Sequence, residues 1–178
     1  NRCLAIPETT KYCSFSFVEN DIVFSHMVKI VASDCDYDYA VLNSDIHEAW
    51  ARHQSSTLKT DLKYINTSAF ETFPFPSDGK ADLQKSGREL YVLRKKIMGS
   101  QRLGITQLFN MVHDVSKQFS ELESFRDCIV ANNEVVARSF GWDDLNLEHD
   151  FHEVTFLPDN DRVRFTISET ARKEVLRR

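Results

Sequence analysis

Alternating apolar and polar residues near the N-terminus predict β-strands. Over Tyr12–Val18 the side chains of Cys13, Phe15 and Phe17 alternate with those of Tyr and Ser. This period of two indicates a strand with one buried face. Three further short runs, rich in β-branched, aromatic or other apolar residues, predict more strands: Ile22–Phe24, Val28–Ala32 and Tyr39–Leu42.

A helix is predicted next. Ser44 suits an N-cap because its hydroxyl accepts a hydrogen bond from a free first-turn N–H, and the helix is expected from Asp45 to His53. Its inward stripe is predicted to contain Ile46, Ala49, Trp50 and His53. A polar break at Gln54–Thr57 and a short strand at Leu62–Ile65 follow.

The segment Phe73–Pro76 is predicted to be extended. Each Pro restricts its own φ and moves the preceding Phe out of the α region. Its position suggests a boundary between residues 1–76, which are rich in predicted strands, and residues 77–178, where helices are expected to dominate.

Three helices are predicted after this boundary. The first covers Leu83–Met98, the second is capped by Thr106, and the third opens with a capping box from Ser120 to Glu123 and ends before Gly141. The apolar residues assigned to the first helix are Leu90, Leu93 and Ile97. Those assigned to the second are Leu108, Phe109, Val112, Val115 and Phe119, and those assigned to the third are Leu122, Phe125, Ile129, Val136 and Phe140.

A hairpin is predicted near residues 153–167. Its strands, Glu153–Leu157 and Arg162–Ile167, flank the turn Pro158–Asp161, and Ser168 is expected to cap a final helix. The fold class is therefore α+β, with a small, largely antiparallel sheet and a helix first, and helices with a hairpin after it. Because the chain lacks an initial Met and ends at Arg178 without a helix stop signal, it is expected to be part of a longer protein.

Composition fits a globular domain, or two small ones that share a core. The chain has 178 residues, 42% hydrophobic and 28% charged, and has no apolar run near the ~18 residues of a membrane span. The net charge is −5, but Lys80–Arg102 has seven basic against two acidic residues, a net +5 that leaves −10 elsewhere. Such a basic run fits either DNA contact or a solvated helix.

Motifs for catalysis and metal binding are missing from the sequence. The four Cys form no Cys-x-x-Cys pair, and free thiols in a reducing cytoplasm are expected. His47 and His53 lack the spacing of a helical zinc pair. Asp34, Asp36 and Asp38 lack the Gly and Glu of a calcium loop, and are expected to be exposed loop carboxylates, with hydrogen bonds to DNA bases as an alternative. No metal or cofactor site is assigned, and an autonomous enzyme is not expected.

The polar segment after the first helix is the candidate DNA-contacting region. Small hydroxyls and Lys bind phosphates, whereas Arg and Gln make bidentate contacts with bases. The candidate residues are Arg52, His53, Gln54, Ser55, Ser56, Thr57, Lys59 and Lys63. The alternative is a polar surface loop. The nearby aromatics Trp50, Phe70, Phe73 and Phe75 are interpreted as packing residues rather than stacking platforms for bases.

The block Leu42–Pro76 resembles the target-recognition region of fused type II restriction–modification enzymes and adenine-specific DNA methyltransferases. It contains a helix with His-x-x-Trp, then Leu-Lys-Thr-Asp-Leu-Lys-Tyr, then Phe-Pro-Phe-Pro. The helical half is also similar to the region that follows target recognition, although Phe109 and Phe140 stand where Tyr is usual. The family's catalytic motifs are absent here, including Asn-Pro-Pro-Tyr and Asp-Pro-Pro-Tyr.

The resemblance implies a non-catalytic DNA sequence-recognition module. Its partners would be double-stranded DNA and a methyltransferase domain of the same chain that uses S-adenosylmethionine, in the cytoplasm of a bacterium and with a role in phage defence. A second hypothesis is a protein-interaction domain that docks on the methyltransferase core with little DNA contact. Neither the recognised bases nor the presence of a nuclease in the parent follows from these residues.

Overall fold

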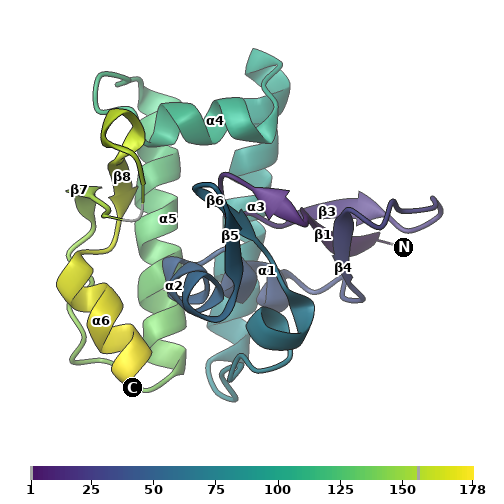
Figure 1. Cartoon of the computed structure of the whole chain (residues 1–178), viewed down its shortest axis with the longest axis horizontal. Coiled ribbons are helices and arrows are strands. Elements are labelled where there is room, and N and C mark those ends of the chain that lie inside the picture. Colours follow the sequence, from purple (N-terminus) through teal and green to yellow (C-terminus); the bar gives the residue numbers. More distant parts are fainter. Residues whose placement is uncertain (1, 156) are drawn as a thin grey trace.

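The structure, a computed structural model, describes residues 2–155 and 157–178 (Figure 1). Three small antiparallel sheets accompany six α-helices in the described part of the chain. In chain order the elements are β1 Arg2–Pro7, β2 Thr9–Thr10, β3 Ser16–Glu19, β4 Val28–Val31, α1 Asp36–Leu42, α2 Asp45–Gln54, β5 Ser56–Leu58, β6 Asp61–Lys63, a π-helical turn Asn66–Phe70, α3 Lys80–Gln101, α4 Ile105–Val112, α5 Ser120–Ser139, β7 Asp150–Glu153, a 3-10 turn Asp159–Asp161, β8 Val163–Thr166 and α6 Glu169–Arg177. The mixture of N-terminal sheets and later helices confirms the predicted α+β class.

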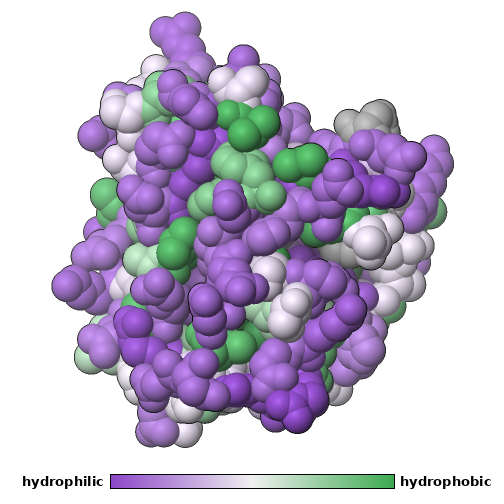
Figure 2. All heavy atoms as spheres, turned by 90° about the vertical axis from the view of Figure 1, so that its left-hand side faces the viewer, coloured by the Kyte–Doolittle hydropathy of each residue, from purple (hydrophilic) through white to green (hydrophobic). Residues whose placement is uncertain are grey.

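The long helices α3 and α5 run side by side, and the other elements pack around them (Figure 1). Helix α4 crosses one end of this pair, and the β7–β8 hairpin and α6 lie against α5 (Figure 1). The sheet β3-β1-β4 lies on the other side of the pair, and strands β5 and β6 of the sheet β2-β6-β5 are seen between the two (Figure 1). In the view turned by 90°, hydrophilic residues cover most of the face formed by α5, α6 and the hairpin, and hydrophobic residues form separate small patches (Figure 2).

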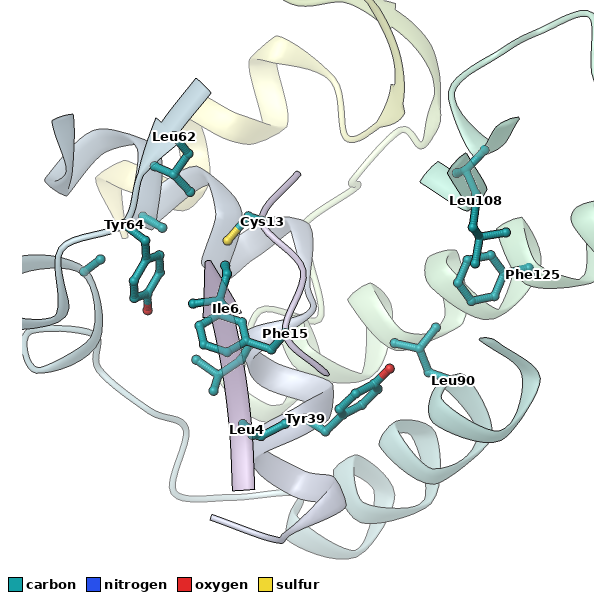
Figure 3. Close-up of a cluster of buried hydrophobic side chains, with 14 of the residues drawn as sticks. Leu4, Ile6, Cys13, Phe15, Tyr39, Leu62, Tyr64, Leu90, Leu108 and Phe125 are labelled. Carbon is teal, nitrogen blue, oxygen red and sulfur yellow. The ribbon is translucent and has the colours of Figure 1, made fainter. Parts of the chain in front are cut away.

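A shared core joins the two halves of the sequence. Leu4 and Ile6 of β1 are fully buried, with Leu62 of β6 beside them and Leu90 and Phe125 coming from α3 and α5 (Figure 3). Because these side chains come from both sides of Pro76, the halves fold against each other rather than as separate bodies. Burying a Leu or Phe side chain contributes about 1.5–3 kcal/mol, so this joint core is a large part of the stability.

The N-terminal strands differ from the prediction. Strand β1 was not predicted, and of Tyr12–Val18 only the part from Ser16 onward is a strand. Residues 12–15 are irregular, and Tyr12 and Ser14 are buried together with Cys13 and Phe15. The alternation failed because this segment is covered on both sides: the Tyr12 ring stacks 5.5 Å from Phe109 and 5.0 Å from His113.

Two other predicted strands are wrong. Tyr39–Leu42 belongs to helix α1, whose last four residues are all buried. A helix surrounded by protein has no polar face, so its sequence reads like a buried strand. Ile22–Phe24 lies in the β3–β4 loop, where Val23 is 99% exposed. Strand β4 confirms the prediction for Val28–Ala32, and β6 covers the first part of the strand expected at Leu62–Ile65.

The helix predictions are mostly confirmed, with corrected ends. Ser44 and Ser168 accept N-cap hydrogen bonds from the backbone N–H groups of His47 and Ala171. Thr106 is not a cap, because Gly104 occupies that position and its N–H donates to the Gln107 side chain. Helix α4 ends at Val112, which leaves the expected stripe residue Val115 57% exposed in the loop that follows.

The capping box at Ser120 is also wrong. Helix α5 begins at Ser120 with Phe119 as its N-cap, and the Ser120 hydroxyl donates to Glu121. Gly141 has φ +74°, as expected for the residue after a helix. The hairpin begins earlier than predicted: Asp150 pairs with Thr166 and Glu153 with Val163.

Arg94 connects α3 to the N-terminal part. The sequence places it in a basic run, but only 5% of this residue is exposed. Its guanidinium donates to the Ser14 hydroxyl at 2.8 Å and to the Phe15 carbonyl at 2.7 Å. A buried charge needs such partners because an unpaired one is strongly destabilising. Arg94 therefore holds the irregular segment and is removed from the surface charge.

Helices α1 and α3 approach each other at Gly87. A Cβ atom at this position would lie 1.9 Å from the Asp36 carbonyl oxygen and 3.1 Å from the Ala40 side chain. Next to it, the Ser86 hydroxyl donates to Asn132 of α5 at 2.8 Å, and the Asn132 amide donates to the Ala40 carbonyl. Glycine is therefore required for the backbone contact that brings the three helices together.

Replacing Gly87 with Ala is expected to destabilise the chain by about 1–3 kcal/mol or more, because the methyl group overlaps a backbone oxygen. Gly99 of the same helix is the matched control, since no atom would lie within 4 Å of a Cβ there. Gly99→Ala should stabilise the protein by about 0.5–1 kcal/mol, the helix preference for Ala. Urea unfolding of both variants measures the difference. A Gly87→Ala variant as stable as Gly99→Ala would contradict the close approach.

Candidate nucleic-acid interface

The predicted DNA-contacting segment forms a short two-stranded hairpin. Strands β5 and β6 pair antiparallel with Leu58 opposite Asp61, so the turn consists of Lys59 and Thr60. Lys59 has φ +57° and is exposed. A left-handed residue in a two-residue turn matches the twist of a hairpin. The arrangement places a lysine at the end of a narrow, projecting ribbon.

One face of this small sheet has a row of polar side chains. Strand β2 extends the hairpin, so that Thr9 lies opposite Lys63 and Lys63 lies opposite Ser56. Residues directly opposite each other in an antiparallel sheet point to the same face. The side chain of Lys63 is 47% exposed, and Ser56 is exposed. Leu62 points the other way and is fully buried, which fixes the side on which the row lies.

His47 packs between helix α2 and the end of the β5–β6 hairpin. This residue of α2 is fully buried, and its Nε2 is 2.9 Å from the Tyr64 hydroxyl, just after β6. Its ring also lies edge-on to Phe73, with ring centroids 4.6 Å apart. The Ser44 cap holds the backbone N–H of His47. The His-x-x-Trp, Leu-Lys-x-Asp-x-Lys-Tyr and Phe-Pro-x-Pro motifs therefore meet in one packed unit around this imidazole.

The electrostatics of this unit are those of a structural core. Burial lowers the pKa of His47 to about 3, so the ring is neutral at neutral pH. Burial also raises the pKa of the Tyr64 hydroxyl well above its usual range. A neutral histidine and a neutral tyrosine can share one hydrogen bond without a buried charge. Nothing in this pair is poised for acid–base chemistry.

Arg52 is used inside the protein. Its Nε donates to the Glu48 carboxylate at 2.7 Å, its Nη2 donates to the Lys11 carbonyl at 3.2 Å, and only 10% of its side chain is exposed. The guanidinium therefore connects α2 to Lys11, the residue that precedes the buried segment 12–15. We therefore assign it a positioning role in the hairpin's support, in place of the base contact expected from the sequence.

The other candidate residues surround the hairpin. His53 is exposed at the end of α2, Gln54 is partly exposed, and Ser55 accepts a hydrogen bond from the Ile65 N–H that closes the base of the hairpin. The residues that share the exposed ribbon are Ser56, Thr57, Lys59 and Lys63. Seven of the eight candidates thus lie on the hairpin or at its base, whereas Arg52 is bound to Glu48 and to the Lys11 carbonyl.

A shallow groove beside Lys63 adds residues that the sequence did not indicate. Lys29 and Lys63 both approach the Glu8 carboxylate, at 2.6 Å and 3.8 Å, and the hydrogen bond from Lys29 is the largest cause that lowers the pKa of Glu8. The groove has a volume of about 440 Å³ and extends to Asn66 and Thr67. Only strand pairing brings Lys29 here, so no local sequence signal could have found it.

The aromatic residues near the prolines pack against one another, as interpreted from the sequence. Phe73 is 7% exposed and contacts the rings of Trp50, Phe75 and Phe140 at 5.3–6.0 Å. Phe70 and Phe75 lie 5.4 Å apart. These rings therefore contact other protein side chains rather than bases. Through Phe73 and Phe140 they connect the segment Phe73–Pro76 to the end of α5.

Of the three aspartates expected to be exposed loop carboxylates, Asp34 is exposed in the loop before α1, as predicted, but Asp36 and Asp38 belong to α1. Asp36 is buried at 7% exposure and binds Arg2 at 2.8 Å, and Asp38 accepts a hydrogen bond from Ser33. Both belong to the first turn of α1, where carboxylates favour the helix dipole. Within residues 2–155 and 157–178, no three His, Cys, Asp or Glu side chains gather as a metal site would require.

Comparison with known proteins agrees with the motif analysis. Residues 3–77 match the family model of the MmeI target recognition domain, which confirms the resemblance of the block Leu42–Pro76. No curated protein sequence matches the chain. A solved structure of the type IIL restriction–modification enzyme MmeI in complex with DNA superimposes with a TM-score of 0.63 at 18% identity, over 80% of this chain. At this identity the likeness shows a shared fold, and this chain spans 19% of that enzyme's length.

The buried His47 gives the stability of the chain a definite pH dependence. Its pKa of about 3 in the folded state lies below the ~6.5 of an unfolded chain. Between these values the unfolded state binds more protons, so the free energy of unfolding falls as the pH falls below about 6.5. The loss is expected to reach about 2 kcal/mol at pH ~5 for this residue alone.

Urea unfolding at pH ~7 and pH ~5 measures the loss. His113, whose pKa burial also lowers to about 3, adds to it in the same direction. His47→Gln should remove the part that belongs to His47 and leave the part that belongs to His113. An equal loss in the His47→Gln variant and the unmodified chain would show that the ring is not buried as a neutral base.

Proposed function

We propose that this chain is a DNA target-recognition module, which reads sequence for a larger DNA-modifying protein and performs no chemistry itself. The match of residues 3–77 to the MmeI target recognition domain is the observation that carries the proposal. The fold shared with MmeI over 80% of the chain supports it. Both the motif block and the exposed hairpin fall inside the matched residues.

The β5–β6 hairpin is the proposed reading element. The major groove of B-DNA admits a two-stranded ribbon, and this ribbon ends in an exposed lysine. Lys59, Lys63 and the hydroxyls of Ser56 and Thr57 would bind phosphates or base edges, with His53 and Gln54 at the rim. Lysine and small hydroxyls are typical phosphate ligands that set the register of a protein on DNA.

The parent protein would supply the chemistry. We propose an adenine-specific DNA methyltransferase that uses S-adenosylmethionine and lies in the same polypeptide, with double-stranded DNA as the shared partner. The cytoplasm is the compartment where such a protein meets its DNA. In the described part of the chain no helix is long and apolar enough to span a bilayer.

A protein-docking role is the second candidate. The residues outside Lys80–Arg102 have a net charge of −10, and Arg52 binds Glu48 instead of facing outward. Both facts reduce the attraction for DNA. In that case the hairpin would contact the methyltransferase core, and its lysines would not change DNA affinity.

Replacing Lys59 and Lys63 with Ala separates these two functions. If both lysines bind phosphates, affinity should fall evenly for all duplex sequences, and the slope of log K against log salt should decrease by about 2, because each contact releases about 0.9 counterion. The Lys117→Ala, Lys173→Ala double variant removes the same charge elsewhere and should have little effect. Fluorescence anisotropy at several salt concentrations measures both. Equal slopes in the two variants would favour docking.

An exchange of segments tests sequence reading directly. Residues 3–77 of a protein that contains this chain would be replaced by those of a relative with a different DNA site. The methylated site should change while methyl transfer continues, because base contacts discriminate at about 1–3 kcal/mol each and the catalytic motifs are absent from the exchanged part. Methylation sequencing identifies the site. An active chimera that keeps the original site would place sequence reading elsewhere.

A further inference from the structure

Helix α3 has a concentration of exposed cations that form no salt bridge with a carboxylate in the described part of the chain. Its exposed basic residues are Lys80, Lys85, Arg88, Lys95, Lys96 and, at the C-cap, Arg102. Within residues 2–155 and 157–178, none of the six has a carboxylate oxygen within 4.0 Å. Helix α6 is the opposite case, because Lys173 and Arg177 bind the carboxylates of Glu169 and Glu174. Helix α6 therefore pairs its cations with carboxylates, whereas α3 does not among the residues that the structure describes.

The cations form a stripe on the outward side of α3. Leu83, Gly87, Leu90 and Ile97 lie on the buried side. At 3.6 residues per turn, the cations at 85, 88, 95 and 96 fall within an arc of about 100° on the other side, and the distance along the axis from residue 85 to residue 102 is about 25 Å. The helix's acids, Asp82 and Glu89, are seven residues apart and stand together at one edge of the stripe.

An aromatic ring holds part of the stripe in place. The Arg88 guanidinium lies 5.9 Å and the Lys95 ammonium 5.8 Å from the centroid of the Tyr91 ring. Arg2 lies 5.4 Å from the same ring and is neutralised by Asp36. Each exposed cation–π contact contributes about 0.5–1 kcal/mol. The two cations on α3 are thus kept near one another, although their mutual repulsion would separate them.

We propose that the outward face of α3 is a second DNA-contacting surface, which binds the phosphate backbone without reading sequence. A row of unpaired cations is stabilised by a partner with regularly spaced negative charge, and duplex DNA has one charge per about 1.7 Å of its axis. Four of the six cations are lysines, which bind phosphates as point charges, and the DNA backbone is therefore the proposed partner. The choice of DNA as the polyanion rests on the proposed function.

The test compares two triple variants of equal charge. Lys85→Ala, Arg88→Ala, Lys95→Ala removes the stripe, whereas Arg138→Ala, Lys173→Ala, Arg177→Ala removes three cations that have carboxylate partners. The probe is a fluorescein-labelled duplex of arbitrary sequence and about 30 base pairs, more than long enough to span the ~25 Å stripe. Thermal unfolding of both variants measures whether the exposed substitutions leave the fold intact.

Loss of the stripe should reduce the slope of log K against log salt by about 3, close to 0.9 for each lost phosphate contact. The control triple should leave the slope unchanged. Equal slopes for the two triples would overturn the inference, since net charge alone would then explain binding. So would loss of binding only in the Lys59→Ala, Lys63→Ala variant. A reduced slope for the α3 triple together with an unaffected Lys59→Ala, Lys63→Ala variant would support α3 and count against the hairpin. Absence of any DNA binding would remove both proposals.

Discussion

The position of the β5–β6 hairpin depends on the buried imidazole of His47. His47 donates or accepts a single hydrogen bond with Tyr64 and presents its ring edge-on to Phe73, while Ser44 holds its backbone. These residues come from α2, from the end of β6 and from the extended exit, which are the three parts of the motif block. A neutral histidine suits this place because it fills space like an aromatic ring and still satisfies a buried hydroxyl. An apolar replacement would leave the Tyr64 hydroxyl without its partner, and that costs about 1–3 kcal/mol. The exposed lysines therefore lie next to a buried pair, His47 and Tyr64, in which both side chains are neutral.

The helical half also supports the hairpin. Arg94 binds the Phe15 carbonyl from α3, and Gly87 lets α1 lie directly on α3. Phe73 and Phe140 bring the exit segment against the end of α5. A recognition surface has to hold its contacting side chains within a small tolerance, and rigid elements packed below it provide that. This explains why the fold shared with MmeI continues beyond the matched residues 3–77 to 80% of the chain.

Local signals were readable from the sequence, and long-range ones were not. The Ser44 cap involves neighbouring residues, and α2 was predicted nearly to its ends. Its predicted inward stripe is only partly right, because Ile46 and Ala49 are buried but His53 is exposed and His47 is buried instead. Helix α1 was not, because it is buried and has no polar side to reveal its period. The sequence also could not separate exposed cations from buried ones: Arg94 and Lys95 are adjacent, yet the first binds Ser14 far away along the chain. Arg52 is different. Its partner Glu48 stands four residues earlier, a spacing at which ion pairs form on helices, so its inward role was open to prediction.

Charge placement reconciles an acidic chain with a partner that is a polyanion. At −5 the whole molecule is repelled by DNA at long range, but salt screens that repulsion beyond about 10 Å at 0.1 M. At contact distance only the local arrangement matters, and there the chain separates its charges. Most cations on α6 are neutralised by carboxylates, whereas Lys59 and the stripe on α3 are not, as far as residues 2–155 and 157–178 show. An acidic body with basic contact regions binds weakly wherever the contacts are incomplete, because each missing phosphate contact leaves the repulsion uncompensated. In the proposed arrangement, such a module would favour correctly seated DNA over random encounters, and its net charge would contribute to selectivity before any base is read.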